Sequence, residues 1–121
     1  MAKRILLIDD ELELAFVTKT RLESAGYEVC TAATAEEALV YLQKNMPDLI
    51  LLDLLLPKMQ GEEFCTFLKS DNRLKHLPVI LFTASAIDIP KVAGEIYADG
   101  YLMKPCEPDV LLSTIKKTLE R

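Results

Sequence analysis

The sequence predicts an α/β fold, a three-layer sandwich in which a five-stranded parallel sheet lies between helices. Short apolar runs, typical of strands buried on both faces, alternate five times with segments of helical spacing. Successive strand–helix units favour a parallel sheet with helices on both faces. The 121 residues make up one domain, residues 1–121, long enough to bury a core without metal or disulfide staples.

The first strand–helix unit begins with an apolar run over residues 4–8. A helix is predicted over residues 11–25, because Gly26 is placed to end it. Residues three or four positions apart define its inward face: Ala15, Thr18, Leu22 and Ala25. One side of this helix is therefore expected to pack on the sheet.

A capping box and a proline break mark the next two units. Residues 27–31 form a short β-prone segment, and Thr34 with Glu37 makes a capping box that starts a helix. The inward residues of that helix are Ala35, Ala38, Leu39 and Leu42. Pro47 breaks the helix, and residues 49–52 form the third buried strand.

The remaining elements are one helix followed by two strand–helix units. Residues 62–71 show helical spacing, and residues 79–82 and 101–103 are predicted strands. The inward residues of the last two helices are Ile89, Val92, Ala93 and Ile96 in the fourth, and Leu111, Ile115 and Leu119 in the fifth.

Acidic residues close two of the buried strands: Asp9 and Asp10 follow the first, and Asp53 follows the third. In the strand order 2-1-3-4-5 these strands are neighbours, and ligands bind at their carboxyl ends. That order brings three carboxylates together. Like charges roughly 5 Å apart repel by about 3 kcal/mol per pair at an effective dielectric near 20, so the cluster indicates a cation or a functional need.

The fourth and fifth strands also end on polar side chains, which topology places at the same edge of the sheet. The fourth ends in Thr83 and Ala84, and the fifth in Lys104 and Pro105. Four strand ends therefore supply carboxylates, a hydroxyl and an ammonium group to one predicted site.

With these motifs the chain resembles the receiver domains of two-component response regulators, which have a flavodoxin-like fold. Four motifs in order carry the resemblance over nearly the whole chain: Asp9-Asp10-Glu11, Asp53-Leu54-Leu55-Leu56-Pro57 with Gly61, Thr83-Ala84, and Tyr101-Leu102-Met103-Lys104-Pro105. The resemblance implies that Asp53 accepts a phosphoryl group from a phosphohistidine. The donor would be a sensor histidine kinase or a histidine phosphotransfer protein.

The resemblance also implies a Mg²⁺ site. Asp10 and Asp53 are expected to supply oxygen ligands, together with the backbone carbonyl of Leu55, while Asp9 acts through a bound water. Lys104 is expected to pair with a phosphoryl oxygen as a mobile point charge, aimed by a cis peptide bond before Pro105.

Thr83 and Tyr101 are the implied switch residues. The hydroxyl of Thr83 is expected to follow the phosphoryl oxygens, and Tyr101 to fill the space that Thr83 leaves. This rotamer pair would bias the face formed by the fourth helix, fifth strand and fifth helix. Output would pass through that face to a downstream protein or effector domain, or through a homodimer.

Composition limits the other partners. The net charge is −5, which argues against direct nucleic-acid binding because phosphate contacts need a basic patch. No apolar stretch reaches the roughly 20 residues of a membrane span, and residues 1–4 lack a signal-peptide pattern. We therefore expect a cytoplasmic protein without membrane contact. Three widely spaced cysteines indicate reduced thiols rather than a disulfide framework.

Two other functions share part of this pattern. Pro90 and Gly94 depart from the family pattern in the fourth helix, and this departure motivates one alternative, a receiver-like binding module that is not phosphorylated. A phosphatase of the haloacid-dehalogenase type also uses an Asp nucleophile and Mg²⁺. That class needs a second Asp two residues after the nucleophile, where this chain has Leu55. On the receiver interpretation the chain is no enzyme, since it catalyses only its own phosphorylation and dephosphorylation.

Overall fold

The computed structural model of the chain describes residues 2–54, 61–84, 89–95 and 98–120. Its five strands form one parallel sheet in the order β2-β1-β3-β4-β5, which confirms the predicted fold class and strand order. The strands are β1 (Arg4–Ile8), β2 (Glu28–Ala32), β3 (Leu49–Leu52), β4 (Val79–Thr83) and β5 (Gly100–Met103). The helices are α1 (Leu12–Ser24), α2 (Ala35–Lys44), α3 (Gly61–Ser70), α4 (Ile89–Glu95) and α5 (Pro108–Leu119).

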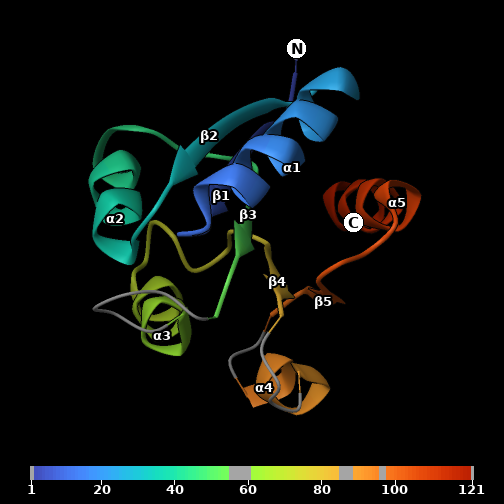
Figure 1. Cartoon of the computed structure of the whole chain (residues 1–121). Coiled ribbons are helices and arrows are strands. Elements are labelled where there is room, and N and C mark those ends of the chain that lie inside the picture. Colours follow the sequence, from blue (N-terminus) through green and yellow to red (C-terminus); the bar gives the residue numbers. More distant parts are fainter. Residues whose placement is uncertain (1, 55–60, 85–88, 96–97, 121) are drawn as a thin grey trace.

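Two layers of helices cover the sheet (Figure 1). Side chains of alternate strand residues point to opposite faces, so each central strand contributes to two cores. Helices α2, α3 and α4 pack over one face, around Leu6, Ile50 and Leu81. Helices α1 and α5 pack over the other face, around Leu7 and Phe82. The result is the flavodoxin-like three-layer arrangement that the alternating pattern predicts.

Local signals behave largely as expected. Thr34 Oγ1 accepts a hydrogen bond from the Glu37 amide at 3.1 Å, so the capping box forms. The Glu37 carboxylate reaches back to the amide of Ala33 at 3.0 Å, one residue before Thr34. Gly26 ends α1 with a φ of 97°, a conformation that glycine adopts without a steric penalty.

Two expected positions need correction near the end of α1. Ala25 is exposed, not inward, because the helix ends at Ser24 and Ala25 is its C-cap. Strand β2 begins at Glu28 rather than at residue 27 and continues to Ala32, because it pairs in register with β1. Expected inward residue Ile96 lies outside the described residues.

The remaining inward residues lie where the helical spacing predicts. Of the α1, α2 and α5 positions, those fully or mostly buried are Ala15, Thr18, Leu22, Ala35, Ala38, Leu42, Leu111 and Ile115. Leu39 and Leu119 are partly buried and pack against the edges of the two cores. None of the helices in the described ranges has the length and apolar character of a membrane span.

Gly61 lets α3 start directly against the end of β3. A Cβ atom at this position would lie 2.8 Å from Leu54 Cα and 2.9 Å from the Asp53 carbonyl oxygen, both of them backbone atoms. Gly94 in α4 has nothing within 4 Å of the corresponding point. The two glycines therefore offer a matched pair of substitutions, one in a close contact and one in open space.

We expect Gly61→Ala to lower the free energy of unfolding by about 2 kcal/mol, because the backbone must shift to relieve the overlap. Gly94→Ala should instead raise stability by up to about 1 kcal/mol, since alanine is the better helix former. Urea unfolding of both variants measures the difference. Equal stabilities for the two variants would contradict the close approach at Gly61.

Candidate functional site

Backbone hydrogen bonds at the ends of the strands place two of the predicted acidic residues. The Asp53 amide donates to the Ile8 carbonyl at 3.0 Å, and the Asp9 amide donates to the Ala32 carbonyl at 3.0 Å. Each residue therefore continues the ladder for one step beyond its strand. Both side chains are buried, with 3% of Asp9 and 4% of Asp53 exposed. The hydrogen bonds of the sheet therefore hold both carboxylates at the carboxyl ends of the strands.

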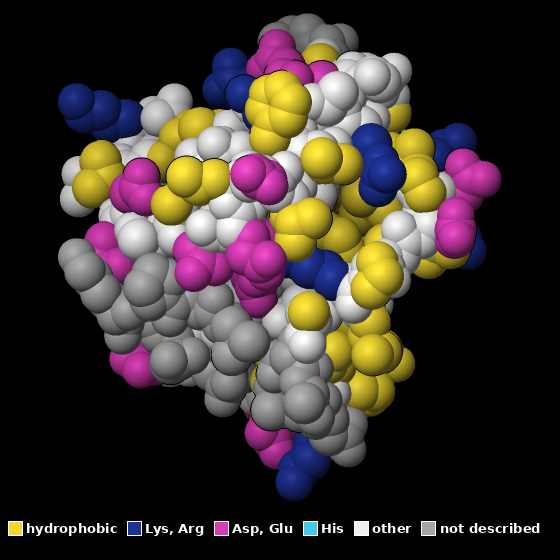
Figure 2. All heavy atoms as spheres, viewed as in Figure 1, with side chains coloured by type: hydrophobic (Ala, Val, Ile, Leu, Met, Phe, Trp, Pro, Cys, Tyr) yellow, Lys and Arg dark blue, Asp and Glu magenta, His cyan; other side chains and the backbone are white. Residues whose placement is uncertain are grey.

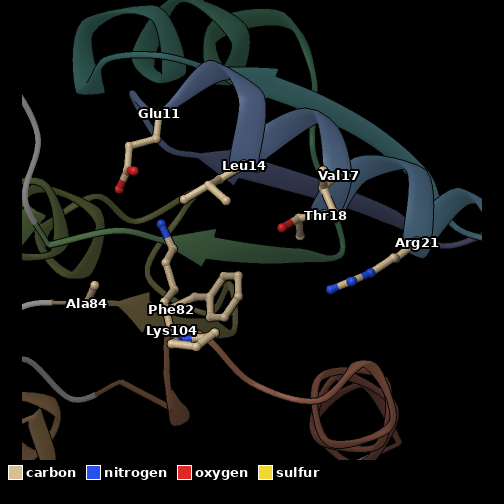
Figure 3. A pocket seen from close by; sticks show the side chains of 9 residues that line it. Glu11, Leu14, Val17, Thr18, Arg21, Phe82, Ala84 and Lys104 are labelled. Atoms are coloured by element: carbon tan, nitrogen blue, oxygen red, sulfur yellow. The ribbon is translucent and has the colours of Figure 1, made fainter.

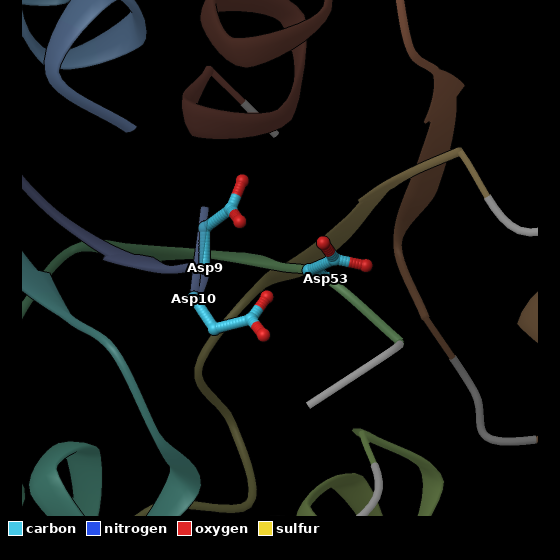
Figure 4. A group of neighbouring side chains, drawn as sticks. All are labelled: Asp9, Asp10 and Asp53. Carbon is cyan, nitrogen blue, oxygen red and sulfur yellow. The ribbon is translucent and has the colours of Figure 1, made fainter. Parts of the chain in front are cut away.

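The three predicted carboxylates converge. Ligand atoms of Asp9, Asp10 and Asp53 all lie within 4.8 Å of one another, and Figure 4 shows the three side chains grouped at the ends of β1 and β3. Asp10 is exposed, unlike the other two. Oxygen ligands in this arrangement suit a hard divalent cation such as Mg²⁺. The charge of such a cluster has to be offset by something cationic.

Lys104 supplies a positive charge to this cluster. Its Nζ donates to Asp9 Oδ2 and, at 3.1 Å, to Asp53 Oδ2. Only 9% of the Lys104 side chain is exposed. The Lys104 amide donates to the Thr83 carbonyl at 3.0 Å, and the Lys104–Pro105 peptide bond is cis, as expected. The ammonium group thus bridges two buried carboxylates.

The protonation of Lys104 follows from these contacts. Burial on its own lowers the pKa of the ammonium group, because the charged form loses hydration. The hydrogen bond to Asp9 and the charges of Asp53 and Asp9 act in the opposite direction and more than offset burial, so the pKa is raised overall. Lys104 therefore remains a cation throughout the neutral pH range.

Thr83 and the residue before α1 donate hydrogen bonds to the remaining oxygens of Asp53 and Asp9. Thr83 is fully buried, and its Oγ1 donates to Asp53 Oδ1 at 2.8 Å. The Glu11 amide donates to Asp9 Oδ1 at 2.9 Å. Among the described residues, no buried side-chain nitrogen or oxygen lacks a hydrogen-bond partner. Each buried carboxylate is therefore held through both of its oxygens.

A cavity of about 260 Å³ opens beside Lys104, between α1 and the ends of β4 and β5. Its lining residues are Glu11, Leu14, Val17, Thr18, Arg21, Phe82, Ala84, Lys104 and Pro105. Figure 3 shows the lysine side chain beside the Phe82 ring at one side of this cavity. The walls are mostly apolar, with charged groups from Glu11, Arg21 and Lys104.

The space-filling view shows the same face of the molecule. Acidic side chains lie beside a basic one near its centre, with hydrophobic side chains above them and to their right (Figure 2). Exposed hydrophobic residues of α1 and β5 include Leu12 at 70%, Phe16 at 69% and Met103 at 62% exposure. The candidate site is thus polar inside and bordered by apolar surface.

The sequence interpretation did not predict two contacts. It counted Phe82 only as a strand residue, and it named Glu11 only as part of the Asp9-Asp10-Glu11 motif. The Lys104 ammonium lies over the Phe82 ring, 5.4 Å from its centroid, and the Glu11 backbone binds Asp9. An aromatic residue directly before Thr83 was the one available signal for the first contact. Of the other expected site residues, Leu55 lies outside the described residues, and Tyr101 is 47% exposed.

The comparison with protein families bears directly on this site. A family model described as the response regulator receiver domain matches residues 5–116. The chain belongs to the response regulator receiver domain family. Receiver domains are signalling modules of two-component systems rather than classical enzymes, and they generally bind Mg²⁺ at an acidic pocket. The acidic cluster of this receiver domain is formed by Asp9, Asp10 and Asp53.

Curated relatives extend beyond this receiver domain. It is 38% identical over 122 residues to the alkaline phosphatase synthesis transcriptional regulatory protein PhoP of Bacillus subtilis, covering 100% of this chain and 50% of the relative. It is 37% identical to the phosphate regulon transcriptional regulatory protein PhoB of Pseudomonas aeruginosa, covering 100% of this chain and 53% of the relative. The chain spans about half the length of these relatives.

Solved structures show the same architecture. The signal receiver domain of a signal transduction histidine kinase from Syntrophus aciditrophicus superimposes with a TM-score of 0.91 at 35% identity, covering 98% of this chain and 91% of that chain. A receiver domain protein from Methanospirillum hungatei gives a TM-score of 0.90 at 36% identity, covering 99% and 95%. Receiver domains of this shape therefore occur in response regulators and in histidine kinases.

Removal of the Lys104 charge should destabilise the metal-free protein. We expect Lys104→Met to lower the free energy of unfolding by about 3 kcal/mol, because two buried carboxylates lose their shared cation. Lys116→Met removes an exposed lysine from α5 and should change stability by less than about 0.5 kcal/mol. Urea unfolding in EDTA tests both variants, and equal losses would show that the buried ammonium is not needed.

Proposed function

We propose that this receiver domain is a phosphoacceptor switch in which Asp53 takes a phosphoryl group from a phosphohistidine. The donor is a sensor histidine kinase or a histidine phosphotransfer protein. One observation carries the proposal: the buried Asp53 carboxylate accepts hydrogen bonds from Thr83 and Lys104 beside two further carboxylates. The family membership of residues 5–116 supports the same function.

The chemistry follows from the groups around Asp53. One carboxylate oxygen attacks phosphorus, the bond between phosphorus and the donor imidazole nitrogen breaks, and an acyl phosphate forms on Asp53. The electron pair of the broken bond stays on the imidazole. Phosphoryl transfer depends mainly on positioning and electrostatic stabilisation. Lys104, already hydrogen-bonded to Asp53, is placed to pair with a phosphoryl oxygen.

The residues present also fit a divalent cation. Three carboxylate side chains within 4.8 Å form an oxygen donor set of the kind that Mg²⁺ prefers. We assign Asp10 and Asp53 as direct ligands, with the Leu55 carbonyl as the third. Asp9, engaged by Lys104 and by the Glu11 amide, acts through water. When bound, Mg²⁺ neutralises the charge of the incoming phosphoryl group.

The signal leaves the site through Thr83. Its hydroxyl exchanges the bond to Asp53 for one to a phosphoryl oxygen, and Tyr101 of the adjacent strand β5 turns inward. Leu81 pairs with Tyr101, and Thr83 with Met103, so both strands lie in direct contact. Tyr101 is 47% exposed and Met103 is 62% exposed, so neither side chain is fixed in the core before this rearrangement.

The face formed by α4, β5 and α5 is the proposed output surface. It would contact a downstream protein, an effector domain or a second copy of the chain in a homodimer. The net charge of −5 argues against direct contact with nucleic acid. We propose that the domain acts in the cytoplasm and that it catalyses only the phosphorylation and dephosphorylation of Asp53 itself.

Asp53 itself provides the main test. Wild-type protein treated with acetyl phosphate and Mg²⁺ should gain the mass of one phosphoryl group, and Asp53→Asn should not. Asp48→Asn is the matched control, because Asp48 comes directly before β3 and Asp53 directly after it. The side-chain oxygen of the new asparagine can still accept the hydrogen bond from the Arg4 backbone amide. Undiminished labelling of Asp53→Asn, measured by intact mass spectrometry, would refute the assignment. No labelling of the wild type would favour the non-phosphorylated binding module.

Asp10 tests the metal assignment. We expect Mg²⁺ to raise the thermal midpoint of the wild-type protein, because an ion that binds only the folded state stabilises it. Asp10→Asn should weaken Mg²⁺ binding at least tenfold, or by about 1.4 kcal/mol, whereas Glu13→Gln on the exposed side of α1 should retain it. Thermal unfolding across a Mg²⁺ titration gives both affinities. Equal shifts in the two variants would remove Asp10 from the ligand set.

A further inference from the structure

The Lys104 ammonium group has an aromatic neighbour in addition to its carboxylates. It lies over the Phe82 ring, 5.4 Å from the centroid, within the roughly 6 Å at which a ring face attracts a cation. Phe82 is 7% exposed, and the Lys104 side chain is 9% exposed. Because water is largely excluded from both groups, the attraction is weakly screened.

The fold brings these two residues together from different strands. Alternation along β4 directs Leu81 into the core under α2 and α3, and Phe82 into the core under α1 and α5. Lys104 follows β5, and its amide is bonded to the Thr83 carbonyl at 3.0 Å. Its side chain then runs beside the Phe82 ring (Figure 3), and its Nζ donates to Asp9 and Asp53.

The cavity next to the ring is lined by charged groups other than the carboxylates that bind Lys104. Glu11 and Arg21 line the same cavity as Lys104 and Phe82. Glu11 is exposed, so a further carboxylate besides Asp9 and Asp53 borders the space beside the lysine stem. The Phe82 ring occupies one wall of that space. A smaller side chain at position 82 would widen the cavity and free the lysine stem.

We propose that Phe82 is a positioning residue whose ring face holds the Lys104 ammonium at Asp9 and Asp53, and that it thereby sets the rate of phosphoryl transfer to Asp53. The role in rate rests on the proposed function of Asp53. The role in positioning rests only on the contact between the ring and the ammonium. The two parts can therefore be tested separately.

The rate is tested with variants that keep or remove the ring. With phosphoramidate and Mg²⁺, we expect Phe82→Leu to slow phosphorylation by roughly fivefold, within the range of a cation–π contact, and Phe82→Tyr to stay within about twofold of wild type. Phe64→Leu is the matched control. Phe64 is fully buried in the opposite core, around α2 and α3. The Phe64→Leu variant therefore loses core packing but keeps the contact between Phe82 and Lys104.

Fluorinated phenylalanines at position 82 separate electrostatics from shape. Fluorine withdraws electron density from the ring face while leaving the size of the ring nearly unchanged. The proposal expects the rate to fall stepwise with the number of fluorines, while the urea midpoint stays nearly constant. A rate that is independent of fluorination, or an equal loss of rate in Phe64→Leu, would overturn the proposal.

A second measurement needs no phosphorylation. The ¹⁵N NMR signal of the Lys104 ammonium, protected from exchange by its contacts, should persist in Phe82→Tyr and Phe64→Leu and broaden or vanish in Phe82→Leu. An unchanged signal in Phe82→Leu would overturn the positioning role. If the wild type takes up no phosphate while the signal responds as expected, the function of Asp53 fails and the positioning role stands.

Discussion

Asp9 and Asp53, two buried carboxylates at the end of the sheet, share the ammonium group of Lys104, and the rest of the site is arranged around that contact. Burial of two like charges is unfavourable without a cation, and breaking such an arrangement leaves charges that water cannot reach. Hydrogen bonds from Thr83 and from the Glu11 amide satisfy the remaining carboxylate oxygens. The acidic site is therefore part of the folded structure and not only a feature of its surface.

Sheet topology makes this contact feasible. Strand β1 lies between β2 and β3, and Asp9 and Asp53 each extend the ladder with one further backbone hydrogen bond. Strands β4 and β5 then deliver Thr83 and Lys104 to the same edge, joined by a backbone bond of 3.0 Å. The strands of a parallel sheet all have their carboxyl ends on the same side, so side chains from distant parts of the sequence meet there.

The same edge connects the buried site with exposed surface. Thr83 is fully buried against Asp53, whereas Met103, its register partner on β5, is 62% exposed. The paired strands β4 and β5 therefore carry one residue beside the carboxylates and its register partner on the face of α4, β5 and α5. On the other side, Phe82 joins Lys104 to the cavity under α1. Thr83 and Lys104 are therefore each in contact with a residue or strand that borders one of these two surfaces.

Much of this could be predicted from the order of the amino acids. Apolar runs, the Thr34 capping box and Gly26 are local signals, and they indicated the strands and most helix ends. The carboxylates and Lys104 were predictable because a parallel sheet collects its strand ends, and family motifs then suggested their roles. Position-specific errors, such as Ala25, arose where a helix ended one residue earlier than its periodicity suggested.

Other features depend on the tertiary structure. Alternation shows which face Phe82 occupies, but no local pattern shows that the lysine following β5 places its ammonium group over the Phe82 ring. The Glu11 amide likewise finds Asp9 only because α1 starts at the edge of the sheet. Such contacts join residues far apart in sequence or depend on how a helix meets a strand. The spacing of residues in the sequence determines which face of a helix or strand each side chain occupies. Packing, twist and register determine how far apart two elements lie.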